Sequence, residues 1–478
     1  MKPHQRPAAS RRDFLFHAGG GLGGLALQWM TAQQARADAG RTPGHPLAAK
    51  KPHHAPTAKR VIFLFMTGGP SQMDLFDPKP EMTKRHGQPL PASRGKTKSQ
   101  FTSGGETVLA STRRFARHGQ SGAWVSDLLP NLARCADDIT FLKSCTGKST
   151  IHAPAMYELH TGRTLMGHPS LGAYVTYGLG TVNENLPAYC VMPQPEGVPE
   201  GGAPCWGSAY LPAVYQGTLL RKGAAPILNL QPPAGVTPEA NRRTFDFVKT
   251  LNGMNRPPGG DGDFDARVAS YELAFRMQTH APEAVDLSKE TKETKALYGL
   301  DQPRTQDFGT RLLLARRLVE RGVRFVQVYS GGGPLSMQWD AHDDVNQNHE
   351  KMCGHVDRPI AGLLTDLKRR GLLKDTLVVW CSEFGRTPNS QGSKGRDHNP
   401  LGYTMWLAGG GAVGGRSLGA TDDFGLNAVE SPVSVNDFHA TLLWMLGLDH
   451  EQLTVRHDGR DERLTDVAGN VVREVFDG

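Results

Sequence analysis

The sequence has only six cysteines among its 478 residues. Six is too few for a disulfide scaffold in a chain of this length, and their spacing lacks the paired pattern of a zinc ribbon. Cys190 and Cys205 flank a segment rich in Pro and Gly, where an oxidising compartment would permit a bridge. Spacing alone does not fix the pairing, so this bridge stays one of the arrangements that the sequence allows.

Long apolar runs are also missing. After residue 37 no segment is apolar enough to span a bilayer, so we expect no stable membrane span. A stripe of Lys and Arg with interleaved aromatic residues is absent too, and nothing therefore supports a nucleic-acid partner. Residues 1–37 contain five basic side chains and one acidic one, so their removal lowers the formal charge from +7 to +3. The remaining chain is only mildly basic.

The first 37 residues have the order of a signal peptide. A polar start leads to Arg11 and Arg12, followed by a weakly apolar stretch that ends near Met30 and small residues at 35–37. The paired arginines before Asp-Phe-Leu resemble a twin-arginine signal. We therefore expect a partnership with the twin-arginine translocase and a periplasmic or otherwise exported protein. Residues 38–57, rich in His, Pro, Ala and Lys, are predicted to be a flexible linker.

Beyond residue 58, short apolar runs alternate with amphipathic segments. This alternation predicts one α/β domain over 58–478, with a mostly parallel, doubly wound sheet flanked by helices and an insertion at about 79–122. The predicted strands are 60–66, 139–143, 323–329, 376–381 and 403–408, and the predicted helices are 124–135, 306–321, 355–371 and 435–447.

Acidic and imidazole side chains follow three of these strands. Asp74 comes after the first, Asp340 and His342 after the run that ends at 329, and Glu383 and His398 after the run that ends at 381. The carboxyl ends of parallel strands meet at one edge of a sheet, where ligands bind. Carboxylate oxygens and imidazole nitrogens together suit zinc or a similar divalent ion, and a bound cation offsets the repulsion among clustered acids.

Three segments resemble the alkaline phosphatase and sulfatase superfamily. Residues 371–385, GLLKDTLVVWCSEFG, look like the sulfatase strand that leads into a metal-binding D-H-G or D-N-G. Residues 433–447 resemble the superfamily's closing helix, and 152–162, HAPAMYELHTG, align without a gap with the signature C-x-P-S-R-x-x-L-x-T-G. The segments GGPSQMD, WDAH, EFGRTP and RDH resemble, more specifically, an exported bacterial domain-of-unknown-function family, number fifteen-oh-one.

The sequence also departs from the superfamily. His152 stands where sulfatases convert a Cys or Ser to formylglycine, and Met156 replaces the signature's Arg. No cysteine begins a C-x-P-x-R, so formylglycine chemistry is excluded. Phe384 occupies a position where the superfamily has a second metal ligand.

The resemblance implies one or two divalent metal ions, zinc first, with manganese, calcium or magnesium as alternatives. The implied metal ligands are Asp74, Asp340, His342, Glu383 and His398, with His349 as a substitute for His342.

The candidates for the nucleophile are His152, Ser149, Thr150 or a metal-bound hydroxide, and His152 is alternatively a metal ligand. Arg386 and Arg396 are predicted either to hold an anionic ester oxygen or to form structural ion pairs.

The function that the resemblance implies is hydrolysis of phosphate or sulfate esters, on a small molecule or a polysaccharide. The main alternative is a non-catalytic metal-containing binding or surface protein of the same fold, because the usual nucleophile is missing. A metal-dependent mutase or lyase is a third reading.

Overall fold

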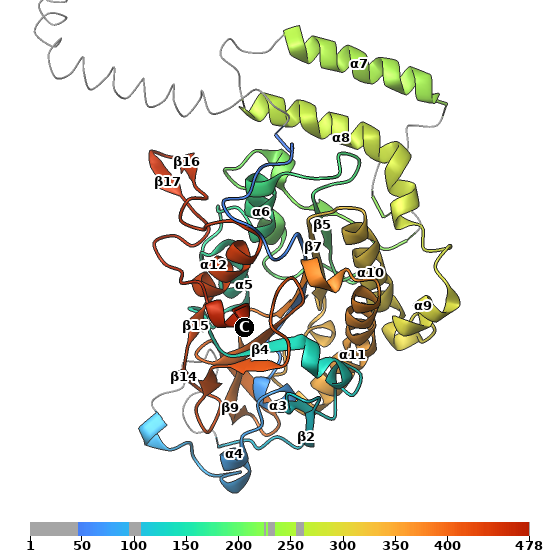
Figure 1. Ribbon diagram of the computed structural model, residues 1–478. Helices are drawn as coiled ribbons and strands as arrows, with labels where there is room; N and C mark the ends of the chain where they lie inside the picture. Colours follow the sequence, from blue (N-terminus) through green and yellow to red (C-terminus); the bar gives the residue numbers. More distant parts are fainter. Residues whose placement is uncertain (1–45, 95–106, 224–225, 228–234, 255–261, 478) are drawn as a thin grey trace, which may run out of the picture. The chain divides into compact units, whose positions relative to one another are not determined.

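The computed structural model describes residues 46–94, 107–223, 226–227, 235–254 and 262–477 (Figure 1). The predicted signal peptide and residues 95–106 of the predicted insertion lie outside these ranges. The chain divides into two units at His45 and Pro46, and all described residues belong to the second. None of the described helices is long and apolar enough to cross a membrane.

One large sheet organises the described residues. Its strands are β1 (Arg60–Met66), β4 (Ile139–Thr146), β5 (Tyr189–Met192), β6 (Thr218–Leu219), β7 (Phe325–Ser330), β8 (Thr376–Cys381), β11 (Tyr403–Ala408), β12 (Arg416–Leu418) and β15 (Val433–Ser434). Their order is β12-β4-β11-β8-β1-β7-β5-β6, with β15 beside β4. Strands β8, β1, β7, β5 and β6 run parallel, whereas β11 is antiparallel to both neighbours. The prediction of a mostly parallel sheet is confirmed, with β11 as the exception.

Helices flank this sheet. They are α3 (Gln72–Leu75), α4 (Pro80–Lys84), α5 (His152–Thr161), α6 (Leu171–Leu179), α7 (Pro238–Met254), α8 (Gly262–Val285), α9 (Lys292–Leu297), α10 (Pro303–Glu320), α11 (Val345–Arg369) and α12 (Val435–Met445). Short 3-10 helices are η1 (Ala92–Arg94), η2 (Leu132–Asp138), η3 (Ala203–Trp206), η4 (Ala213–Tyr215), η5 (Leu335–Met337), η6 (Leu373–Asp375) and η7 (Arg473–Val475).

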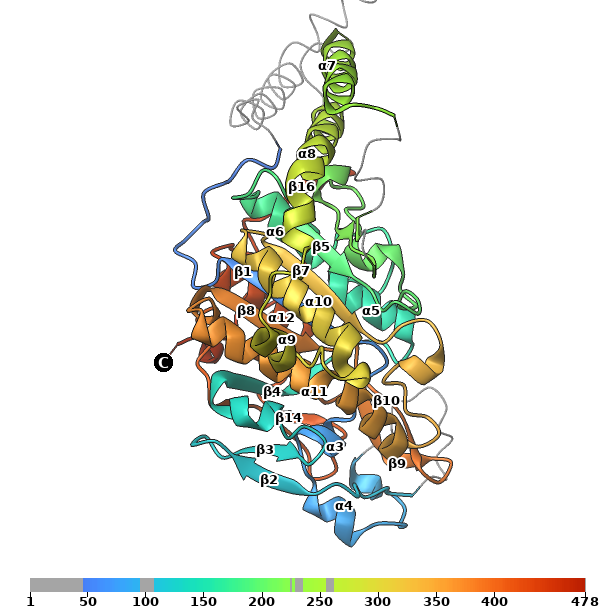
Figure 2. The same cartoon turned by 90° about the vertical axis from the view of Figure 1, so that its right-hand side faces the viewer.

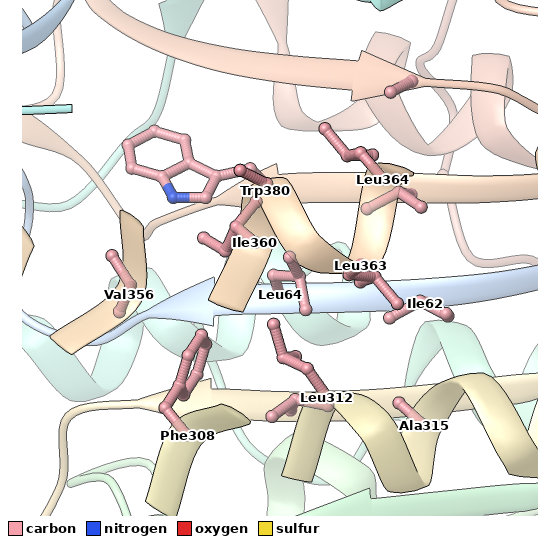
Figure 3. Packing of buried hydrophobic residues seen from close by; sticks show 14 of the residues in the cluster. Ile62, Leu64, Phe308, Leu312, Ala315, Val356, Ile360, Leu363, Leu364 and Trp380 are labelled. Atoms are coloured by element: carbon pink, nitrogen blue, oxygen red, sulfur yellow. The ribbon is translucent and has the colours of Figure 1, made fainter. Parts of the chain in front are cut away.

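Strand β1 lies at the centre and is covered on both faces. Ile62, Leu64 and Met66 pack in one core with α10 and α11, which Figure 3 shows at close range. The alternate residues Val61 and Phe63 pack in a second core with α5, α6 and α12. Side chains of a strand alternate between faces, so a strand with a core on each side is apolar throughout. This explains the unbroken apolar run at 60–66.

The predicted helix over 124–135 is wrong. Residues Ala123–Ser126 form strand β3, which pairs with β2 (Phe115–His118). The helical part of this region is the 3-10 helix η2, Leu132–Asp138. Pro130 lies between the two pieces, and proline can neither donate to a helical ladder nor fit its interior.

Helix α11 begins ten residues before the predicted start at 355. Its N-cap is Asp344, whose side chain accepts hydrogen bonds from the backbone N–H groups of Asn346 and Gln347. A capped start of this kind satisfies amide groups that would otherwise lack partners. The longer helix includes His349, which is buried and accepts a hydrogen bond from the Ser71 amide.

Two smaller expectations need correction. The second half of the predicted flexible linker packs on the domain: Leu47 is buried, and the Lys50 amide donates to Leu179 O at 3.0 Å. All six cysteines are buried and free, so Cys190 and Cys205 form no bridge in this structure.

Hairpins extend the chain beyond the main sheet. Strands β9 (Gly385–Gln391) and β10 (Gly395–Asn399) form one that starts four residues after β8, near α3 (Figure 2). Strands β13 (Ala420–Thr421) with β14 (Ala428–Glu430), and β16 (Val455–His457) with β17 (Arg460–Glu462), form two others. The β9–β10 hairpin is polar yet almost wholly buried, which makes it the part of the chain most relevant to chemistry.

Candidate metal centre

Three segments deliver His152, Asp340, His342 and His398 to one point, with one donor atom of each within 4.8 Å of the others. His152 is the first residue of α5, and His398 lies on β10. Asp340 and His342 belong to the loop between β7 and α11. The side chain of His342 is 20% exposed, against 9% for His152 and 1% for His398.

The Asp340 carboxylate is the centre of this group. Its Oδ1 lies 3.0 Å from His342 Nε2 and 3.2 Å from His398 Nε2. Its Oδ2 lies 3.5 Å from Nε2 of His152. Burial opposes ionisation of Asp340, but its contacts with the three histidine rings and the charge of Arg386 hold the pKa of Asp340 well below its ordinary value. Asp340 is therefore an anion.

The other nitrogen of each ring, Nδ1, has an acceptor of its own. His152 Nδ1 lies 2.9 Å from Glu383 Oε1, and His398 Nδ1 lies 2.6 Å from the carbonyl oxygen of Thr150. His342 Nδ1 is bonded to Gln391 Oε1. Carbonyl and carboxylate oxygens only accept, so each Nδ1 donates and each Nε2 faces Asp340. Metal-binding histidines in proteins are held in this way.

The distance between His342 Nε2 and His398 Nε2 is only 3.0 Å. Burial lowers the pKa of His398 to about 3 despite its hydrogen bond to Asp340, so this ring is neutral near pH 7. Two nitrogen lone pairs at such a distance repel unless a proton or a metal cation lies between them. These four side chains could therefore hold a metal ion.

His152 contacts two carboxylates, those of Asp340 and Glu383. Burial alone would lower the pKa of His152, but hydrogen bonds with Asp340 and Glu383 raise it to about 9. Near neutral pH the ring keeps a proton that a metal ion would have to displace.

Glu383 was predicted to be a metal ligand, and the structure places it behind His152. Its Oε1 accepts from the Gly68 amide at 2.8 Å as well as from His152, and its Oε2 accepts from Ser382 Oγ at 2.7 Å. Glu383 is therefore not one of the four converging donors. It orients one of them.

Asp74 was also predicted to be a ligand, and it lies outside the four. Its Oδ2 is 2.9 Å from Arg396 Nε and accepts from Ser71 Oγ at 2.5 Å. Burial raises the pKa of Asp74, but the Arg396 charge and the serine hydrogen bonds outweigh that effect and lower it.

His349, the predicted substitute for His342, is likewise engaged elsewhere. Its Nε2 accepts from the Ser71 amide at 2.8 Å, and burial lowers its pKa to about 3. His342, and not His349, is one of the four converging residues.

The two arginines predicted to hold substrate are fully buried and already bonded. The Arg386 guanidinium donates to the backbone oxygens of Gly68, Gly69 and Arg396, and to Asp340 Oδ1 at 2.6 Å. Every guanidinium nitrogen of Arg386 thus has a protein partner. Both arginines form buried ion pairs, Arg386 with Asp340 and Arg396 with Asp74.

No hydrogen bond seen among the described residues directs the hydroxyl of Ser149 or Thr150 toward the cluster. Thr150 contributes its backbone oxygen to His398, and Ser149 Oγ bonds the backbone of Ile151. Sequence reasoning missed Gln391, because an amide at the end of a hairpin strand carries no signal for a metal site. It also missed that the ring of Phe384 stacks on His398, with centroids 4.2 Å apart.

A family profile described as "Protein of unknown function (DUF1501)" matches residues 58–476. The chain belongs to this family. The match covers every residue of the cluster and its supporting shell, which is what the GGPSQMD, WDAH, EFGRTP and RDH segments predicted. A search of curated proteins returned no match to this member of the family.

Solved structures similar to this DUF1501 chain include a sulfatase from Pseudoalteromonas sp., at 13% identity over 88% of this chain and 76% of that one, with a TM-score of 0.36. The alkaline phosphatase of the Antarctic bacterium TAB5 is 11% identical over 82% of this chain and 99% of its own, with a TM-score of 0.35. A phosphonate monoester hydrolase from Silicibacter pomeroyi is 11% identical over 73% and 71%, with a TM-score of 0.34.

Proposed function

We propose that this protein is a metal-dependent hydrolase of phosphate or sulfate esters, carried on small molecules or polysaccharides. A divalent ion, zinc by preference, would be held by His152, Asp340, His342 and His398. One observation supports this most strongly: three imidazoles turn Nε2 to a single carboxylate while the protein accepts from each Nδ1. A set of three nitrogens and one carboxylate suits zinc better than the all-oxygen preference of magnesium or calcium.

An ion in this position would act as a Lewis acid on an ester oxygen and would lower the pKa of a bound water. The protein residues around it have separate tasks. Glu383 fixes the orientation of His152, Thr150 that of His398 and Gln391 that of His342. His342, whose side chain is 20% exposed, marks the side from which a substrate approaches.

His152 serves as a metal ligand in this proposal, not as the nucleophile. Its Nδ1 is committed to Glu383 and its Nε2 faces Asp340. A nucleophilic ring would need one nitrogen directed at the substrate instead.

The second candidate function is a non-catalytic metal-binding protein. The hydrogen bonds of Arg386 and Arg396 to backbone oxygens favour this second function, because neither guanidinium can contact an anionic ester without breaking some of them. Both functions share the metal centre and differ in turnover.

The test is metal analysis followed by assays. Purified protein and Asp340→Asn would be analysed for bound metal, then assayed on chromogenic phosphate monoesters, phosphate diesters and sulfate esters. Asp138→Asn, which removes a surface carboxylate paired with Lys368, is the matched control. Bound zinc with Asp340-dependent turnover supports the hydrolase. Bound zinc without turnover on any ester favours the binding protein, and no bound metal overturns both.

We also propose export through the twin-arginine pathway, on the motif at Arg11 and Arg12, which lies outside the described residues. Changing both to Lys should leave precursor in the cytoplasm. Arg36→Lys, the same chemical change near the predicted cleavage site, should export normally. Normal export of the double variant would refute this assignment.

A further inference from the structure

Asp74 is a buried acid that forms an ion pair with a buried arginine. It lies on α3, is 2% exposed, and has Arg396 Nε at 2.9 Å from its Oδ2. The same oxygen accepts from Ser71 Oγ. A carboxylate in this state has a cationic partner, which is what a metal ion would otherwise provide.

Arg396 cannot easily move aside to admit an ion. Its Nη1 donates to the backbone oxygens of Thr387 and Pro388, each at 3.1 Å, and its Nη2 donates to Leu109 O at 2.8 Å. The side chain is 0% exposed. Displacing the guanidinium would leave three carbonyl oxygens with fewer donors, and a polar group left unsatisfied in a protein interior is destabilising.

The opposite wall of the centre is an apolar ring. Phe384 is completely buried, and its ring centroid lies 4.2 Å from that of His398 and 5.0 Å from that of His152. The ring also lies against Gly69, where an added Cβ would come within 2.7 Å of it. A phenyl ring offers an ion no lone pair, so this side cannot supply ligands to a second cation.

We infer that the centre binds one divalent ion per chain, and that the Arg396 guanidinium occupies the place of a second cation beside Asp74. This inference rests on the proposed metal centre and deepens it. It differs from the two-ion reading that the sequence left open.

The test is zinc stoichiometry. Protein stripped with a chelator would be titrated with zinc by calorimetry, and the bound zinc counted by elemental analysis after removal of excess. We expect one zinc per chain in the natural sequence, one in the double variant Asp74→Asn with Arg396→Gln, and none in Asp340→Asn. The double change removes both charges together and so avoids leaving either one unpaired.

Crystals grown with zinc give a reading that does not depend on the variants. One anomalous peak bounded by His152, His342 and His398 would support the inference. Two zinc ions per chain, a peak at Asp74, or loss of one zinc in the double variant would overturn it while the hydrolase proposal survived. No zinc at all would overturn both.

Discussion

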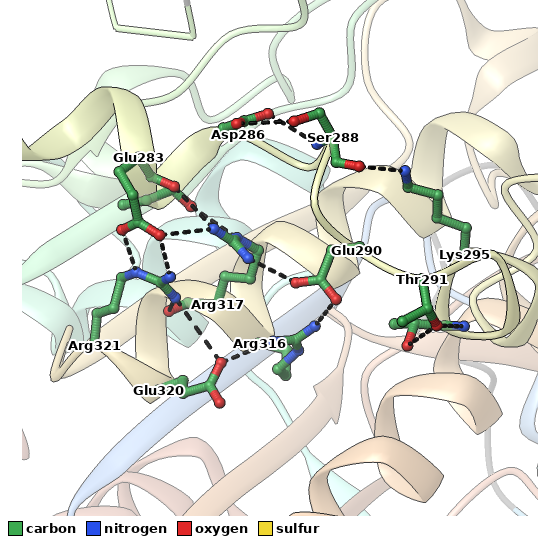
Figure 4. A network of polar contacts seen from close by, with 12 residues as sticks. Glu283, Asp286, Ser288, Glu290, Thr291, Lys295, Arg316, Arg317, Glu320 and Arg321 are labelled. Atoms are coloured by element: carbon green, nitrogen blue, oxygen red, sulfur yellow. Dashed lines mark hydrogen bonds and ion pairs between the residues drawn. The ribbon is translucent and has the colours of Figure 1, made fainter.

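Two clusters of charged side chains among the described residues are built in opposite ways. One surrounds Arg316 and Arg317 of α10, and Figure 4 draws most of it. There Arg316 contacts Glu290 Oε2 and Glu320 Oε2 at 2.8 Å each and Asp366 Oδ2 at 3.1 Å. Arg317 contacts the other oxygen of Glu290 at 2.7 Å. Each acid in this cluster meets a guanidinium.

The metal centre has the opposite arrangement. Asp340 faces three ring nitrogens, and two of these nitrogens lie 3.0 Å apart. Protein acceptors engage each Nδ1, which leaves Nε2 directed inward. In the first cluster the charges are balanced by neighbouring side chains, whereas in the second the donor atoms converge on one point, as the proposed metal site requires.

The largest expected effect is loss of the ion. Asp340→Asn and His398→Ala should each lower zinc affinity by about three orders of magnitude or more, because a ligand is removed from the centre. Zinc at about 100 times its dissociation constant should stabilise the natural protein by about 2.7 kcal/mol. Neither variant should gain this, as followed by thermal unfolding with and without zinc. Equal zinc stabilisation in all three proteins would contradict the assignment.

Breaking the arginine cluster should affect stability instead. Arg316→Met leaves Glu290 and Asp366 with fewer cationic partners in a buried site, which costs about 3–5 kcal/mol. Zinc content per folded molecule should not change. Arg114→Met is the control, since its pair with Asp127 is exposed and is worth less than about 1 kcal/mol. Denaturant unfolding and metal analysis of the same samples separate the two clusters.

Gln391 tests how far the centre depends on its supporting residues. Gln391→Ala should weaken zinc binding about 10–100-fold, because it frees the His342 ring to rotate. Gln391→Glu keeps an acceptor at Nδ1 and should restore most of the affinity. If both variants bind zinc equally well, Gln391 does not orient His342.

Zinc affinity should also depend on pH. The ion-free protein holds a proton on His152 up to its pKa of about 9, and zinc must displace that proton. Affinity should therefore rise by about tenfold per pH unit below 9 and level off above it. Calorimetric titration at several pH values, with correction for zinc hydrolysis, measures the slope. A flat profile between pH 6 and 8 would show that His152 loses no proton on binding.

The smallest effect is expected at Cys381. This thiol lies on β8 in the core, is 0% exposed, and has a pKa raised by burial. Cys381→Ala should cost about 1 kcal/mol through a small cavity and leave zinc content unchanged. Loss of zinc from a stable Cys381→Ala protein would instead link the thiol to the centre.

Several features of the fold were readable from local sequence. The runs at β1 and β8 are apolar throughout because each strand is covered on both faces. Helix α12 has an amphipathic pattern because its apolar residues pack in one core. The helix predicted over 124–135 failed because pairing with β2 outweighed a weak local preference. The start of α11 was missed because a side-chain cap at Asp344, not apolar periodicity, sets it.

The sequence predicted which residues gather at the site, but not what each of them contacts there. Asp340, His342 and His398 were expected to be ligands, and they converge with His152. Asp74 and Glu383 have the same carboxylate chemistry and come from the same sheet edge, yet one binds Arg396 and the other binds the far side of His152. Composition and spacing cannot distinguish these cases, because they differ by only a few ångströms.

The sequence by itself determined the family, the alternation of buried strands and helices, and the edge at which acids and histidines gather. Each follows from short-range sequence patterns that do not depend on the details of side-chain packing. Only the tertiary structure decided which nitrogen of each histidine faces the centre, and that Arg386 and Arg396 are held by backbone oxygens from distant segments. Hydrogen-bond partners more than 200 residues apart, such as Thr150 with His398 and His152 with Glu383, exist only after the chain has folded.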